Sequence, residues 1–97
     1  MADLHVVATI PARPGSEEVV REALSTLAAA TQGHEGCLSY QLFESAAAPG
    51  TFVTVETWRR QEDLDAHLAS QDIATAMGAA EGHLAGDIAV HPLHPVD

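Results

Sequence analysis

The sequence contains no lysine, and its only permanently cationic side chains are four arginines. Against them stand 14 aspartate and glutamate residues, which give a formal net charge of −10 at pH 7. A surface this acidic repels phosphate backbones and anionic lipid headgroups. We therefore expect no nucleic-acid partner and no membrane partner.

Cysteine is almost absent too. Cys37 is the only one, which excludes an internal disulfide and a zinc site made of several thiolates. Its thiol is interpreted either as a small buried strand residue or as a reactive group. There is no HExxH motif, and His91 and His94 share an i, i+3 spacing only near a proline-rich end. We expect no metal site.

Other absences concern chemistry and location. The chain has no glycine-rich phosphate loop and no serine in a G-x-S-x-G elbow. No apolar run approaches the ~20 residues of a membrane-spanning helix, and the N-terminus lacks the basic start and long apolar core of a signal peptide. These absences favour a cytoplasmic protein. The length of 97 residues suits a single domain spanning 1–97, with a thin core.

Hydrophobic periodicity predicts six main elements. Period-two alternation is typical of strands, and apolar residues at i, i+4 and i+7 are typical of a helix. The strands are expected over residues 4–10, from Gly36 onward, over 51–58 and over 84–93. The helices are expected over roughly 16–32 and from about Gln61, the latter interrupted at Ser70 and ended by Gly82.

The resulting order, β-α-β-β-α-β, predicts an α+β, ferredoxin-like fold, a four-stranded antiparallel sheet with helices on one face. The strands are apolar on both sides, since Val53 and Val55 alternate with Phe52 and Trp58. Two helices can cover only one face of such a sheet. An uncovered apolar face is unusual for a monomer, so we expect a homodimer that packs sheet against sheet.

A tryptophan and a histidine are placed close together by short connections. Trp58, the only tryptophan, ends the third predicted strand, and His67 follows nine residues later on a helix. An indole supplies a large apolar wall, and an imidazole exchanges protons near neutral pH. The pair predicts a small pocket for proton chemistry on an apolar substrate. Core packing by Trp58 and a structural hydrogen bond by His67 are the open alternatives.

Two further side chains are candidates for the same pocket. Glu56 shares its strand face with the tryptophan, and a buried carboxylate there could orient the imidazole of His67. An ion pair with one of the arginines at 59–60 is the alternative. Tyr40 could stack in the pocket and donate a phenol hydrogen bond, or its ring could pack at the dimer interface.

Several motifs together resemble one known family. They are Pro14-Gly15 before the first helix, Gly36-Cys37-Leu38-Ser39-Tyr40, Glu56-Thr57-Trp58, and Ala66-His67-Leu68-Ala69-Ser70. With these motifs the sequence resembles the antibiotic biosynthesis monooxygenase (ABM) family of dimeric α+β barrels over nearly its whole length. The motifs are more specific for the fold than for the activity, since family members differ in chemistry.

The resemblance implies a cofactor-independent monooxygenase that acts on a small aromatic hydroxy compound, a quinol or a polyketide-like molecule. The substrate anion itself would reduce molecular oxygen, so neither flavin nor metal is expected. The protein would supply a base, hydrogen bonds and an apolar cavity. We assign His67 as the base or anion partner and Tyr40 as a hydrogen-bond donor, with Glu56 beside them. The expected apolar walls are Trp58, Phe52, Ile73 and Met77.

The sequence departs from the family pattern at three positions. The haem-degrading branch requires an asparagine and a histidine where this chain has Ala8 and Met77, which disfavours haem degradation. Many quinol-type relatives carry a further histidine where this chain has Asp72. Two alternatives to a monooxygenase remain: a non-catalytic small-molecule-binding or stress-response module on the same scaffold, and an isomerase or decarboxylase.

Overall fold

Four strands form one antiparallel sheet in the order β2-β3-β1-β4. The computed structural model describes residues 3–96. The elements in chain order are β1 (Leu4–Pro11), α1 (Glu17–Thr31), β2 (Cys37–Glu44), β3 (Thr51–Trp58), α2 (Gln61–Leu68), α3 (Gln71–Ala80) and β4 (Ala89–Leu93). This arrangement confirms the predicted ferredoxin-like fold, with the second helical segment divided at Ser70.

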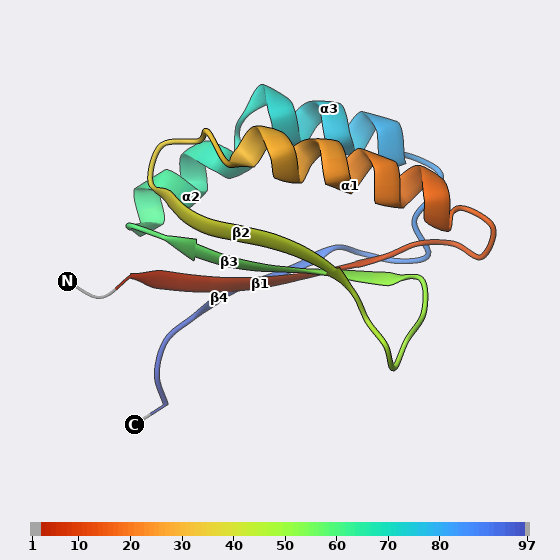
Figure 1. Cartoon of the computed structure of the whole chain (residues 1–97), viewed down its shortest axis with the longest axis horizontal. Coiled ribbons are helices and arrows are strands. Elements are labelled where there is room, and N and C mark those ends of the chain that lie inside the picture. The colour runs from red at the N-terminus through yellow and green to blue at the C-terminus, as the bar shows by residue number, and fades with distance from the viewer. Residues whose placement is uncertain (1–2, 97) are drawn as a thin grey trace.

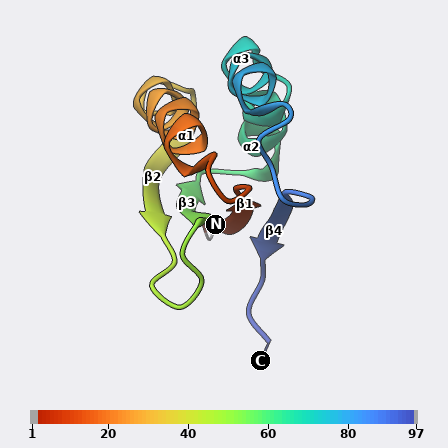
Figure 2. The same ribbon diagram turned by 90° about the vertical axis from the view of Figure 1, so that its right-hand side faces the viewer.

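All three helices lie on the same side of the sheet (Figure 1). Seen end-on, α1 covers β2 and β3 while α2 and α3 lie beside it, and no element within residues 3–96 covers the opposite face (Figure 2). The inner face follows the predicted alternation, since Val6, Ala8 and Ile10 on β1 are buried. None of the helices within residues 3–96 has the length and apolar character needed to cross a membrane.

The core between sheet and helices consists of two clusters. One joins the middle of the sheet to α1 and includes Phe52, Leu24 and Leu27. The other lies near α2, where β3 ends, and comprises Val6, Tyr40, Trp58 and Leu64. Buried polar side chains interrupt the apolar packing, namely Thr54, Glu56, His67, Asp63 and Thr31. Burial of polar groups is costly unless they are hydrogen-bonded. Thr54, Glu56 and His67 line one cavity between the sheet and the helices, which makes that cavity the candidate site.

A β-bulge corrects one predicted face. The alternation from Gly36 places Leu38 beside Tyr40, with Cys37 on the other side. In the structure, Cys37 pairs with Trp58 and Ser39 with Thr57, so Leu38 is an extra residue in β2. Leu38 is 54% exposed, whereas Cys37 packs against the Trp58 cluster. A bulge shifts the alternation by one residue, and the parity of the sequence does not reveal it.

The last strand is shorter than predicted. Residues 84–93 were expected to pair continuously, but β4 begins at Ala89. Leu84 makes only an isolated bridge to Ala12, and Gly86 lies between the two pairings. The polar, glycine-containing stretch 85–87 weakens strand propensity. This loop brings Leu84 and Ile88 against the first core cluster.

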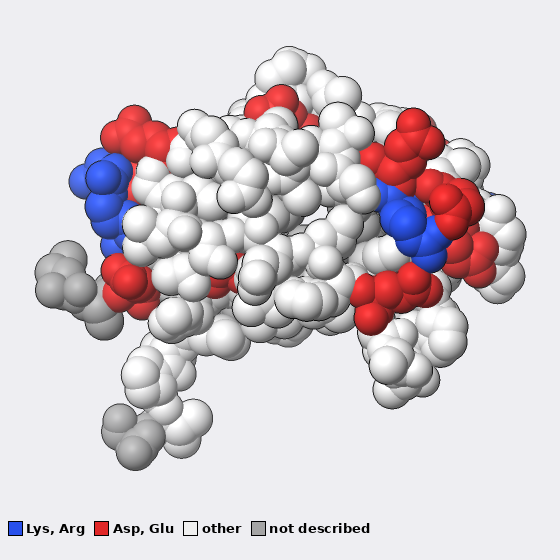
Figure 3. Space-filling model, in the orientation of Figure 1, with Lys and Arg blue, Asp and Glu red and all other residues white. Residues whose placement is uncertain are grey.

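The uncovered sheet face is apolar, as predicted. Register places Val55 between Val7 and Gln41, and Val53 between Thr9 and Phe43. Phe43, Val55 and Leu93 are among the exposed large hydrophobic residues. Figure 3, drawn in the orientation of Figure 1 with the helices above the sheet, shows a different side of the molecule, on which most charged side chains gather toward the two ends.

Candidate active site

His67 lies in the last turn of α2, where the chain changes direction into α3. Ser70 fixes this corner with two hydrogen bonds: its hydroxyl donates to the carbonyl of His67 (2.6 Å) and accepts from the amide of Ile73 (3.3 Å). A serine at the N-cap satisfies a free amide of the following helix. These two bonds therefore fix the backbone of His67 at the corner between α2 and α3.

The imidazole of His67 is 3% exposed and lies against two aromatic rings. Its centroid is 4.8 Å from that of Trp58 and 5.7 Å from that of Tyr40. Burial first, and then the nearby His34, lower the pKa of His67 from its ordinary value of 6.5 to about 4, against a smaller opposing effect of Asp72. A charged imidazolium is disfavoured in such surroundings. His67 is therefore neutral at pH 7 and able to accept a proton.

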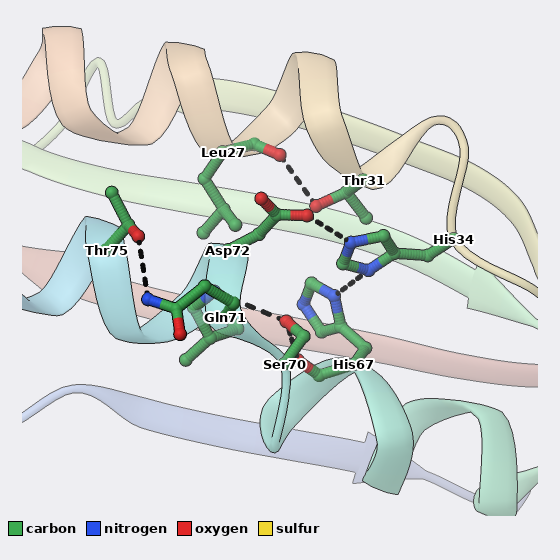
Figure 4. A network of polar contacts seen from close by, with 9 residues as sticks. Leu27, Thr31, His34, His67, Ser70, Gln71, Asp72 and Thr75 are labelled. Carbon is green, nitrogen blue, oxygen red and sulfur yellow. Dashed lines mark hydrogen bonds and ion pairs between the residues drawn. The ribbon is translucent and has the colours of Figure 1, made fainter.

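His34, which sequence reasoning overlooked, is the nearest polar partner of His67. It belongs to the turn between α1 and β2, which the amide of His34 stabilises by donating to the carbonyl of Thr31 (2.9 Å). The Nδ1 atoms of the two histidines are 2.9 Å apart, and Nε2 of His34 is 2.7 Å from Oδ2 of Asp72 (Figure 4). Three separate elements thus supply one continuous polar chain.

Glu56 is buried but contacts neither His67 nor an arginine. Its two carboxylate oxygens accept from the indole N–H of Trp58 (2.8 Å) and from the hydroxyl of Thr54 (2.7 Å). All three residues lie on the inner face of β3. Both sequence interpretations of Glu56 are replaced by this arrangement. Arg59 and Arg60 instead approach Asp63.

A cavity of about 220 Å³ lies between the sheet and the helices, and His67 forms part of its wall. Tyr40, Glu56, Ile73 and Met77, four of the other predicted site residues, also line it. The remaining lining residues are Ala8, Ile10, Leu24, Leu27, Thr54, Leu68, Ile88 and Val90. The lining is thus mostly apolar, with its few polar groups concentrated where His67, Tyr40 and Glu56 meet.

Trp58 and Phe52 were expected as pocket walls, but the cavity lining does not include them. Both are almost completely buried, each in a different core cluster. Trp58 supports the ring of His67 and donates to Glu56, so its contact with the cavity is indirect. The indole packs on the side of the imidazole that faces away from the cavity. The spacing of nine residues could not show whether the two rings would line the cavity together or stack in this way.

Two other titratable groups near the cavity are held in their protonated forms. Burial raises the pKa of the Tyr40 hydroxyl, and the negative charge of Glu56 raises it further. The same two causes, in the same order, raise the pKa of the Cys37 thiol. The Tyr40 hydroxyl therefore keeps its proton at neutral pH, and the Cys37 thiol is a poor nucleophile there.

Among residues 3–96, no group of three or more histidine, cysteine, aspartate or glutamate side chains is arranged to hold a metal ion. The His67–His34–Asp72 chain is linear, since His34 uses both ring nitrogens for its two neighbours. The three side chains are thus linked in series by hydrogen bonds and do not converge on a common point, as metal ligands would.

Comparison with known proteins decides the family. The model of the family "Antibiotic biosynthesis monooxygenase" matches residues 3–79. The chain belongs to this family. The ABM resemblance of the sequence motifs is thereby confirmed. Ala8 and Met77, the two residues on which the sequence analysis disfavoured haem degradation, both line the cavity with apolar side chains.

Individual ABM relatives agree with this assignment. The chain is 32% identical over 92 residues to "Putative monooxygenase Rv0793" of Mycobacterium tuberculosis, covering 95% of this chain and 90% of that protein. The structure of Rv0793 superposes with a TM-score of 0.87 at 30% identity, covering 99% and 97% of the two chains. PA3566 from Pseudomonas aeruginosa superposes with a TM-score of 0.89 at 26% identity, covering 100% and 97%.

Proposed function

We propose that this ABM protein is a cofactor-independent monooxygenase that oxidises a small aromatic hydroxy compound with molecular oxygen. The observation that carries the proposal is a buried imidazole, neutral at pH 7, on the wall of an apolar cavity. A base with this placement can remove a proton from a bound hydroxyl group. Family membership supports monooxygenase chemistry.

The size of the cavity favours a substrate with one aromatic ring. An apolar cavity of roughly 150 Å³ in another protein admits benzene, so about 220 Å³ accommodates a hydroquinone with its two hydroxyl groups. A polycyclic substrate exceeds this volume. Of the two substrate classes implied by the family resemblance, we therefore propose the quinol.

The reaction balances without a further reductant. Nε2 of His67 takes the proton of one hydroxyl group, and Tyr40 donates a hydrogen bond to the resulting anion. The electron-rich ring then transfers electrons to dioxygen, one oxygen atom becomes bonded to a ring carbon, and the other leaves as water. One hydroquinone and one dioxygen give one hydroxyquinone and one water. The apolar walls limit access of bulk water to the anion.

Oxygen uptake tests this proposal. We expect purified protein to accelerate oxygen consumption by at least one single-ring hydroquinone, with formation of one hydroxyquinone per oxygen. Anthrone-type polycycles serve as the size comparison, and heat-denatured protein serves as the blank. Rates equal to the blank across the panel would contradict the proposal. Ligand-induced thermal stabilisation without oxygen consumption would instead support the non-catalytic binding module, and turnover without air would support an isomerase or decarboxylase.

We also propose that two copies associate through the uncovered sheet face. Val55 is 41% exposed at the centre of that face, and apolar patches of this kind commonly mark interfaces. We expect the wild type to sediment as a dimer of the 10.2 kDa chain and Val55→Arg as a monomer, because the charge would be buried without a partner. Val19→Arg, at an equally exposed position on α1, is the matched control. A monomeric wild type at micromolar concentration would contradict this proposal.

A further inference from the structure

A chain of three side chains connects the buried cavity to the molecular surface. His67, on the cavity wall, is followed by His34, whose side chain is 17% exposed, and by Asp72, whose side chain is 48% exposed. The exposed fraction thus rises steadily along the chain of contacts. On its outer side, the histidine pair borders a second, more open depression that includes Glu35, Asp63 and Ser70.

The hydrogen bonds of this chain have only one consistent arrangement when Asp72 is ionised and both rings are neutral. A carboxylate can only accept, so Nε2 of His34 must carry the proton. The other nitrogen of that ring, Nδ1, then has a lone pair. It must accept from Nδ1 of His67, which is 2.9 Å away. Nε2 of His67 is left unprotonated.

This free nitrogen is the one that the proposed reaction needs. Among residues 3–96, no group makes a hydrogen bond to Nε2 of His67, and the ring borders the cavity. In the opposite tautomer of His67, Nε2 would carry the proton, and the two Nδ1 atoms would face each other with a lone pair on each and no proton between them. The carboxylate of Asp72 therefore acts through His34 to determine which ring nitrogen of His67 is basic.

We propose that Asp72 and His34 fix the tautomer of His67 and carry the proton it receives out to solvent. The first part concerns the protein without substrate; the second rests on the proposed function. When Nε2 takes a substrate proton, the Nδ1 proton of His67 passes to Nδ1 of His34. The Nε2 proton of His34 passes to Asp72 and then to water. One proton enters, one leaves, and both rings are neutral again; reversal of the path returns a proton for the water formed at the end of the reaction.

Within the cavity, the alternative exits for this proton are poor. The rest of the cavity wall is predominantly aliphatic, and the two oxygens of Glu56 already accept from Trp58 and Thr54. Tyr40 is protonated and faces His67 from β2. Because burial also disfavours an imidazolium at His67, a rapid transfer to His34 avoids holding a charge beside the apolar cavity.

Nitrogen NMR of the substrate-free protein tests the tautomer. In the wild type at pH 7, we expect long-range ¹H–¹⁵N spectra to show the proton on Nδ1 of His67 and on Nε2 of His34. In Asp72→Asn the carboxylate acceptor is lost, and we expect both rings to become mixtures of tautomers. Asp65→Asn, an exposed aspartate of α2 bonded only to Gln61, should leave both rings unchanged. A wild-type His67 protonated at Nε2, or unaltered tautomers in Asp72→Asn, would overturn the tautomer assignment whatever the activity.

Kinetics test the proton path separately. We expect His34→Ala and Asp72→Asn to lower kcat by about tenfold or more while KM changes little, since a wrongly held imidazole fails as a base but not as a wall. Added free imidazole should restore part of kcat in His34→Ala, and Asp65→Asn should match the wild type. An unchanged kcat in His34→Ala would overturn the path. If the wild type consumes no oxygen with any substrate, the proposed function fails and the path with it, while the NMR result still decides the tautomer.

Discussion

Replacing His67 with glutamine lowers kcat for oxygen uptake by about 10²–10⁴-fold, on our expectation, because general-base catalysis contributes that much. Glutamine keeps most of the volume and can still hydrogen-bond to His34, but it cannot take a proton. The packing against Trp58 and Tyr40 is thereby largely preserved. Stopped-flow or electrode measurement of oxygen consumption, with KM determined for the same hydroquinone, checks the loss.

A matched control separates catalysis from general damage. His83 is a half-buried histidine whose Nδ1 lies 3.0 Å from the hydroxyl of Ser16, and it is absent from the cavity lining. His83→Gln should therefore keep wild-type kcat. Retention of more than half the wild-type kcat in His67→Gln would remove His67 from the reaction. Ligand-binding measurements on the same variant would show whether the pocket survives.

The depressed pKa of His67 also sets the acid side of the pH profile. Since the base must be unprotonated, activity should persist well below pH 6.5 and fall only near the folded pKa of about 4. The stability of the fold also depends on pH through this group. Between about pH 6.5 and about pH 4, His67 binds a proton more readily in the unfolded chain than in the folded one. This group therefore lowers the free energy of unfolding as pH falls through that window, by up to about 3 kcal/mol. His67→Gln should lose that part of the pH dependence.

The elements of the fold could be predicted from the sequence because their hydrophobic patterns are local. Alternation on β1 and β3 and the spacing of Val20, Leu24 and Leu27 on α1 each identify a buried face. The interruption at Ser70 was also visible, since serine is a good N-cap. The bulge at Leu38 could not be predicted, because it arises from the pairing of β2 with β3, and the residues of β2 alternate in the sequence as they would in a regular strand.

The site was only partly predictable, for a reason that its contacts make clear. His67 and Trp58 are nine residues apart and joined by a short connection, so their proximity could be inferred. His34 is separated from His67 by 33 positions and from Asp72 by 38, and nothing in the spacing connects them. The family resemblance offered one signal, since it marked Asp72 as a departure from an expected histidine, but it named no partner for that carboxylate.

Trp58→Ala should cost about 3–5 kcal/mol of folding free energy, the usual loss for a large aromatic side chain removed from a core. Trp58 is fully buried, anchors the second core cluster, and donates its indole proton to Glu56. A domain of this size has only about 5–15 kcal/mol in total, so the variant should be close to unfolding at 37 °C. Urea denaturation at pH 7 measures the change. Val19→Ala on the exposed side of α1 should shift it by less than about 0.5 kcal/mol.

Trp58→Phe and Glu56→Leu divide this loss into packing and hydrogen bonding. Phenylalanine restores much of the apolar contact but leaves Oε1 of Glu56 without its indole donor, and an unsatisfied buried polar group costs about 1–3 kcal/mol. Glu56→Leu likewise leaves the indole N–H and the Thr54 hydroxyl without their acceptor. Because one hydrogen bond is counted in both single variants, the double variant should be less destabilised than the sum of the two. Simple additivity would mean that Glu56 and Trp58 are not coupled, and the polar support behind His67 would then have to come from elsewhere.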